Sequence, residues 1–104
     1  MRLFIKKWIA ALRSGKYQQG RQLLRQDDYY CCLGVLCEVE GLEAKLLTTR
    51  YMYDGHEATL PQSIETKYGL SHDMMGQLAS KNDVGWTFEE IADYIEQNEE
   101  RLFV

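Results

Sequence analysis

The chain has few of the features that characterise secreted and membrane proteins. It contains one proline and three cysteines, an odd number that cannot pair completely. No apolar run approaches the roughly 20 residues that a membrane-spanning helix needs. Lys6 and Lys7 interrupt the first apolar stretch, whereas a secretory signal needs a continuous apolar segment. These absences predict a cytoplasmic protein with no membrane partner, and they argue against a disulfide-stabilised secreted domain.

Length and composition are those of an ordinary globular protein. The chain has 104 residues, of which 45% are hydrophobic and 27% are charged. These values are typical of a folded chain and not of a disordered one. Because a chain of this length can bury one modest core, we expect a single domain over residues 1–104.

Acidic residues are absent from the first 26 positions, which carry seven basic residues. The other 78 positions carry five basic residues and all 16 acidic residues, so a segment of charge +7 precedes one of charge −11. Such asymmetry indicates a face that binds an anion. The alternative is that the basic segment packs against the acidic C-terminal helix, so that the two charges cancel.

The N-terminal third predicts one helix and a polar connection. Residues 3–14 form an amphipathic pattern that ends at Gly15, a residue suited to the left-handed conformation after a helix. The apolar positions of this pattern follow the spacing i, i+3, i+4, i+7: Ile5, Trp8, Ile9 and Leu12. Residues 16–29 are polar, and we expect a long connection with one short strand near 22–25.

The most apolar segment is residues 30–39. Asp27 and Asp28 precede it as candidate N-caps and Gly41 follows as a candidate C-cap, which together predict a buried helix. A buried strand is the alternative, because periodicity does not separate the two for a short apolar run. Gly34 lowers helix stability, so its presence indicates close approach by another element or by a ligand.

The second half predicts a β-hairpin followed by helices. Residues 46–60 contain a candidate strand at 48–53, a turn at Asp54-Gly55 and a return strand at 56–60. A short helix over 62–68 follows Pro61 and ends at Gly69.

Two more helices follow. Ser71 is the candidate N-cap of the first, and residues 82–85 form a loop after it. Thr87 and Glu90 form a candidate capping box for the last. The whole chain therefore predicts an α+β fold, mainly helical, with a small antiparallel hairpin or sheet.

Cysteines and histidines supply the first candidate chemistry: Cys31, Cys32, Cys37, His56 and His72. The cysteine spacing does not match the Cys-x2–4-Cys pairs of zinc sites, and a redox centre would need a more polar setting. A cysteine nucleophile would need a histidine close to it in space. The favoured interpretation is that the cysteines are small core residues. We expect no catalytic residue, no metal and no cofactor.

A second set of residues, within positions 13–30, suits an anionic ligand. Arginine forks and backbone amides bind phosphates, aromatic rings stack on bases, and glutamine reads base edges. The candidate ligand-binding residues are Arg13, Lys16, Tyr17, Gln19, Gly20, Arg21, Arg25, Tyr29 and Tyr30. Long nucleic acid is disfavoured as a partner because the net charge of the chain is −4.

Two runs resemble a widespread family of small, mostly uncharacterised tailed-phage proteins. One is the run from Trp8 to Gly20, and the other is the Tyr-Cys-Cys-Leu-Gly-Val-Leu-Cys run at 30–37. Residues 78–95 are also similar to the end of those proteins. The resemblance implies a protein of the infected bacterial cytoplasm, where small phage proteins often counter host defence. One such class sequesters the cyclic nucleotide signals of CBASS or Thoeris systems.

These features are compatible with three functions. The first is a non-enzymatic, homo-oligomeric binder that sequesters a cyclic di- or oligonucleotide immune signal. The second is a protein-interaction module that inhibits or redirects a host protein. The third is a small nucleotide hydrolase that uses Asp83 or a cysteine.

Overall fold

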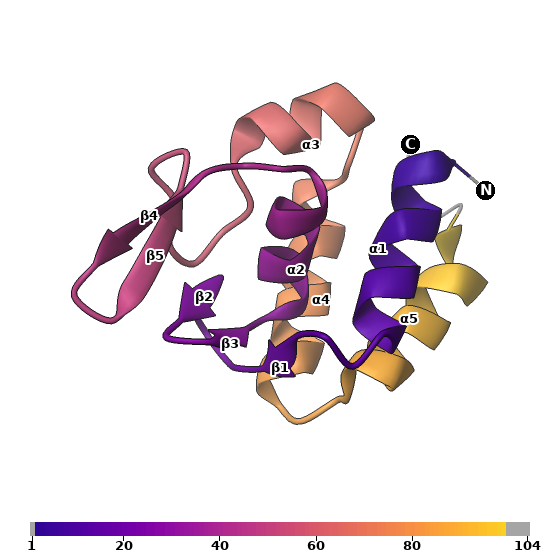
Figure 1. Ribbon diagram of the computed structural model, residues 1–104. Helices are drawn as coiled ribbons and strands as arrows, with labels where there is room; N and C mark the ends of the chain where they lie inside the picture. Colours follow the sequence, from indigo (N-terminus) through magenta and orange to yellow (C-terminus); the bar gives the residue numbers. More distant parts are fainter. Residues whose placement is uncertain (1, 100–104) are drawn as a thin grey trace.

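The computed structural model describes residues 2–99, which form helices and a small mixed sheet (Figure 1). The helices are α1 (Leu3–Arg13), α2 (Cys32–Val39), α3 (Gln62–Tyr68), α4 (His72–Asp83) and α5 (Phe88–Gln97). The strands are β1 (Gln18–Gln19), β2 (Arg25–Gln26), β3 (Tyr29–Tyr30), β4 (Ala44–Leu47) and β5 (Arg50–Tyr53). The predicted α+β fold class is confirmed.

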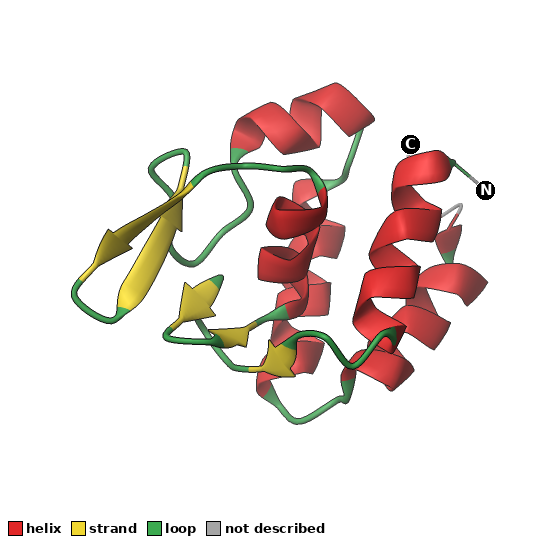
Figure 2. Cartoon of the chain, viewed as in Figure 1, coloured by secondary structure: helices red, strands yellow, loops and turns green. Residues whose placement is uncertain are grey.

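The apolar helix α2 lies at the centre of the molecule. It packs against α1 on one side and α4 on another, and α5 packs against both α1 and α4. Strands β2, β4 and β5 lie on the side of α2 away from α1 and α5 (Figure 2), whereas β1 lies near the ends of these two helices. The order of the sheet is β1-β3-β2-β5-β4, in which only β1 and β3 run parallel.

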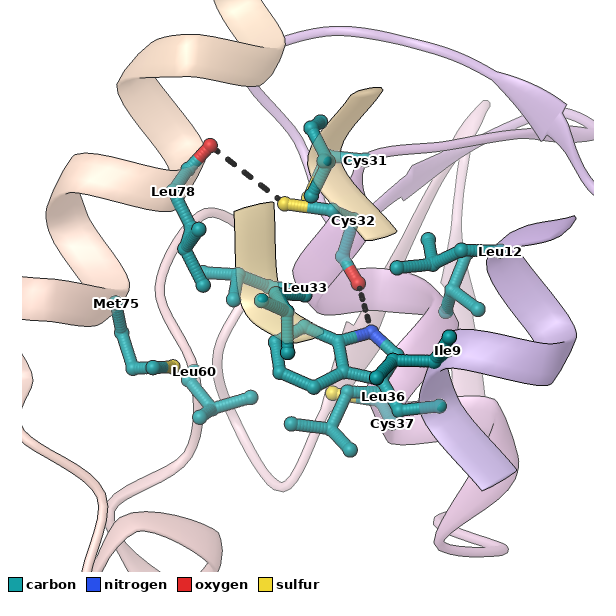
Figure 3. Close-up of a cluster of buried hydrophobic side chains, with 14 of the residues drawn as sticks. Ile9, Leu12, Cys31, Cys32, Leu33, Leu36, Cys37, Leu60, Met75 and Leu78 are labelled. Atoms are coloured by element: carbon teal, nitrogen blue, oxygen red, sulfur yellow. Dashed lines mark hydrogen bonds between the residues drawn. The ribbon is translucent and has the colours of Figure 1, made fainter. Parts of the chain in front are cut away.

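Helix α1 matches its prediction closely. Its stripe of apolar side chains is buried, and Gly15 adopts a φ of 76° just after the helix. The buried Trp8 indole donates a hydrogen bond of 2.9 Å to the Cys32 carbonyl at the start of α2, which is marked in Figure 3. This bond satisfies a polar group inside the core and fixes α1 against α2.

The 30–39 segment is helical from Cys32 onwards, so the helix prediction is confirmed over the strand alternative. A Cβ added to Gly34 would lie 1.8 Å from the Leu24 carbonyl oxygen. The close approach predicted for Gly34 is therefore made by another segment of the chain. At the other end, Gly41 has a φ of 75° and follows the helix as predicted.

Asp27 and Asp28 do not cap α2, which corrects the prediction. They form the two-residue turn between β2 and β3, in which Asp27 has a φ of 54°. The N-cap position is occupied by Cys31, whose side chain makes no capping bond. Instead, Asn82 of α4 accepts a hydrogen bond of 3.2 Å from the Cys32 amide. Aspartate favours turns as well as caps, so the local sequence did not separate the two roles.

The polar connection contains more strand than the sequence indicates. Three two-residue strands replace the single strand predicted at 22–25, and Gln22 lies in a turn with a φ of 71°. Strands this short carry no periodicity. They form because β3 pairs with both of its neighbours.

The hairpin is shifted from its predicted position. Strand β5 pairs with the preceding strand β4, across a turn at Thr48 and Thr49, and not with residues 56–60. The turn at Asp54-Gly55 does form, but only a single bridge between Tyr53 and His56 follows it. The prediction of a return strand at 56–60 is therefore wrong.

The remaining helix signals are largely confirmed. Gly69 ends α3 with a φ of 67°, Ser71 caps α4, and Thr87 and Glu90 form both bonds of a capping box. The loop predicted at 82–85 begins two residues later, at Val84, because α4 continues to Asp83. None of the helices in the described part of the chain is long and apolar enough to cross a membrane.

Candidate ligand-binding site

The predicted ligand residues fall into separate places, and Arg13 lies apart from the rest. At the end of α1, its guanidinium contacts three carboxylates of α5, with Nη2 at 2.6 Å from Asp93 and other nitrogens at 3.5 Å from Glu89 and Glu96. The hydrogen bond to Asp93 is the main reason that the pKa of Arg13 is raised. At Arg13 the basic segment therefore pairs with the acidic helix, which is the alternative explanation of the charge asymmetry.

Gln19 has its amide bound inside the protein. Its Nε2 donates to Asn82 Oδ1 at 2.9 Å and to the Trp86 carbonyl at 2.6 Å, and its Oε1 accepts from the Phe88 amide at 3.0 Å. Asn82 also donates to the Gly20 carbonyl at 2.8 Å. These bonds connect β1 and the following residue to α4, to the loop after α4 and to α5, which gives Gln19 a structural role.

A row of aromatic and cationic side chains covers one face of the sheet. Arg25 lies between two rings, with its guanidinium carbon 3.8 Å from the centroid of Tyr51 and 5.0 Å from that of Tyr30. Tyr17 packs edge-on against Tyr30, and Lys16 lies 5.5 Å from the centre of Tyr17. The Arg25 side chain is only 18% exposed, so its cation is largely covered.

Tyr51 belongs to this row, although the sequence does not single it out. It reaches Arg25 only because β5 pairs with β2, which places Arg25 opposite Tyr51. Tyr51 does lie in a run of strand-forming residues, but no local sequence pattern predicts that β2 is the strand that pairs with it.

The other face of the same strands carries a small pocket of about 270 Å³. It is lined by Gly20, Arg21, Leu23, Gln26, Asp27 and Tyr29. Three of these were predicted ligand residues, whereas Gln26, Leu23 and Asp27 were not. Gln26 faces this pocket because it is paired with Tyr29 across the β2–β3 turn.

The exposed groups of this pocket suit a planar anion. Tyr29 is 51% exposed, and within residues 2–99 the exposed Arg21 side chain makes no hydrogen bond or ion pair. Gly20 allows a close approach, because a Cβ there would lie 2.8 Å from the Tyr29 Cβ. The pocket therefore joins a free guanidinium, a ring and an amide.

Backbone conformation fixes the walls of the pocket. Gln22 and Asp27, neither of them glycine, have left-handed φ values of 71° and 54°. The Gln22 amide donates to Asp83 Oδ1 at 2.7 Å, and the Asp27 amide donates to the Thr49 carbonyl at 2.6 Å. Such conformations persist only where neighbouring structure holds them, and they concentrate at functional sites.

The cysteines are buried, and their thiols are free. Burial raises the pKa of Cys31 to about 11 and the pKa of Cys32 well above its usual value, which keeps both thiols protonated at neutral pH. His56 and His72 line a different pocket beside Glu65. Within residues 2–99, no three histidine, cysteine or acidic side chains are grouped to hold a metal ion.

Comparison with known proteins yields one family. Neither a curated protein nor a solved structure matches the chain. Residues 1–76 match a family described as a domain of unknown function, DUF8296. The matched region includes α1, the whole sheet, α2 and the pocket, and it ends within α4. The chain therefore belongs to the DUF8296 family.

Proposed function

We propose that this protein is a non-enzymatic binder of a nucleotide at the pocket between Arg21 and Tyr29. The observation that carries the proposal is that an exposed arginine without a partner in residues 2–99 and a half-exposed tyrosine line one pocket of about 270 Å³. Arg21 would bind a phosphate through its fork of N–H donors. Tyr29 would stack on the base, and Gln26 would bind the edge of that base.

The size of the pocket supports a small ligand. Pockets for drug-sized molecules begin at about 300 Å³, so this pocket suits one nucleotide unit. A cyclic dinucleotide would place one of its two units here and leave the other for a second protomer. The net charge of −4 and the carboxylate of Asp27 disfavour a long polyanion.

The biological role that we propose is sequestration of a cyclic di- or oligonucleotide signal of antiviral defence in an infected bacterium. Its support is the resemblance of the 8–20 and 30–37 runs to small tailed-phage proteins. The chemistry of the pocket is compatible with this ligand class, since it offers groups for both phosphate and base.

The test is calorimetric titration with a panel of cyclic dinucleotides and ADP-ribose derivatives. We expect micromolar or tighter binding of at least one compound. Arg21→Ala and Tyr29→Ala should each weaken it about tenfold or more, because a phosphate contact or a stacked base is lost. Tyr29→Phe keeps the ring and should retain most of the affinity. Lys6→Ala, which removes an exposed cation from α1, is the matched control for charge.

Two outcomes would contradict the proposal. One is the absence of binding by every compound at micromolar ligand, and the other is equal loss of affinity in the Lys6→Ala control. Recovery of the bound nucleotide intact after long incubation separates a binder from a hydrolase. A cleaved product would favour the enzyme alternative and would direct attention to Asp83, which is bonded to the pocket wall.

A further inference from the structure

Strand β4 forms one outer edge of the sheet. In the sheet of residues 2–99 it pairs only with β5, through a four-residue antiparallel register that ends at the Thr48-Thr49 turn. The hairpin projects away from the helices (Figure 1). An exposed edge presents a row of free backbone donors and acceptors to another strand.

The register shows which backbone groups point outward. Leu47 and Arg50 are the pair that closes the two-residue turn. In antiparallel pairs, residues alternate between bonding to the partner strand and pointing away from it. Lys45 and Leu47 therefore bond to β5, and Ala44 and Leu46 present their N–H and C=O groups to the outside.

The side chains of this edge are apolar and exposed. Leu46 is 55% exposed and Leu47 is 47% exposed. Both line an open groove of about 980 Å³, together with Leu42 and Met52. Exposed apolar residues on an edge strand are a feature that monomeric proteins usually avoid.

Two charged side chains of this edge form no ion pair within the described chain. Glu43 and Lys45 are both exposed, and among residues 2–99 neither makes an ion pair. They lie two positions apart, on either side of Ala44. A strand with this pattern is complementary to itself when a second copy runs antiparallel to it.

We infer that a second copy of this chain docks on β4 with the two Ala44 residues opposite each other. Each Glu43 then faces Lys45 of the partner subunit, and each Leu42 faces Leu46 of the partner subunit. The outward-pointing backbone groups of Ala44 meet in a hydrogen-bonded pair. A register shifted by two residues, with the two-fold axis at Lys45, would place Lys45 opposite Lys45 of the partner subunit, a like-charge pair that is destabilising.

This arrangement makes a two-fold symmetric dimer, in which one sheet continues across the axis. The inference does not depend on the proposed function, because the β4 edge shares no lining residue with the Arg21–Tyr29 pocket. It specifies the surface through which the predicted homo-oligomer would form.

Sedimentation equilibrium on the full chain, over concentrations up to hundreds of micromolar, tests the inference. The wild type should show a monomer–dimer equilibrium. Lys45→Glu and Glu43→Lys should each weaken the dimer about tenfold or more, since each brings like charges together twice. The double variant that exchanges the two charges should recover the wild-type dissociation constant.

Mixing the two single variants gives a sharper result. A heterodimer of Lys45→Glu with Glu43→Lys has opposite charges at both contacts, so it should form preferentially over either homodimer. At protein concentrations low enough for the wild type to be monomeric, circular dichroism and urea midpoints should be unchanged in all variants, because both side chains are exposed. A wild type that stays monomeric would overturn the inference, even if another molecule were found to bind the β4 edge. A dimer whose dissociation constant is the same in the charge variants would also overturn it.

Discussion

At the residue scale, Gly34 determines how closely the polar connection approaches α2. The Leu24 carbonyl lies where a Cβ would be, and the same oxygen accepts a hydrogen bond of 3.2 Å from the Cys31 amide. Leu24 itself is fully buried. The neighbouring atom is backbone, so it cannot move aside as a flexible side chain could.

Gly34→Ala should therefore destabilise the protein by about 3 kcal/mol or more, since overfilling a packed site forces the backbone to shift. Urea unfolding monitored by circular dichroism measures the effect. The matched control is Gly76→Ala in α4, where an added Cβ meets nothing within 4 Å. That change should stabilise the helix by about 0.5–1 kcal/mol. Similar effects at both positions would contradict the role assigned to Gly34.

Residues of similar chemistry in the 13–30 segment have different environments. Gln19 and Gln26 carry the same amide, but that of Gln19 bonds to α4, to α5 and to the loop between them, whereas Gln26 faces a pocket. Arg13 contacts three carboxylates, whereas Arg25 lies between two tyrosines. Only the placement in three dimensions separates structural residues from candidates for ligand binding.

At the element scale, Asn82 connects segments that are distant in the chain. It is fully buried, and its two amide atoms bond to Gln19, Gly20 and the first amide of α2. An unpaired amide at a helix start needs such a partner, and no side chain of the local sequence provides it. Asn82 therefore replaces the N-cap that α2 lacks.

Asn82→Ala should lower the free energy of unfolding by about 3 kcal/mol, because several buried polar groups lose their partner at once. Gln77→Ala is the matched control, since Gln77 is an exposed amide on the same helix. Its effect should stay within about 0.5 kcal/mol. Thermal or urea unfolding measures both variants. An Asn82→Ala protein as stable as the control would show that water satisfies this cluster.

At the scale of the whole molecule, the buried thiols and one buried phenol make the free energy of unfolding decrease at alkaline pH. Burial is the main cause that raises the pKa of Cys31 from 9.0 to about 11, and it also raises the pKa of Cys32, Cys37 and Tyr53. The folded state then keeps protons that the unfolded state releases. Stability is therefore fully present below pH 9 and decreases as the pH rises toward 11.

Each buried thiol should contribute a slope of up to about 1.4 kcal/mol per pH unit in this window. Urea unfolding at several pH values between 7 and about 11 measures this slope. Cys31→Ala removes one titrating group and should make the slope shallower. A stability that stays constant across the window would contradict the burial of the thiols.

The placement of the basic N-terminal residues is also a property of the whole molecule. Part of the basic N-terminal segment is used inside the protein, since Arg13 joins α1 to the acidic helix α5. Another part, Arg21, is exposed at the pocket. Charge pairing therefore accounts for Arg13, and anion binding stays a proposal for Arg21, a division that composition alone does not reveal.

The sequence by itself determined the helices, because their signals are local. Apolar spacing, the Thr87–Glu90 capping box, Ser71 and the helix-ending glycines depend on neighbours within a few residues. Gly34 also indicated a close contact, since a glycine in a buried helix has a cost that packing must offset.

Only the tertiary structure decided the sheet and the candidate site. Two-residue strands have no period, so β1, β2 and β3 are defined by their pairing partners and not by their residues. The same pairing assigns Arg25 and Tyr30 to one face, and Gln26 and Tyr29 to the other. The cap of α2 comes from Asn82, 50 residues away. Contacts over such distances depend on how the helices pack, which local sequence patterns do not encode.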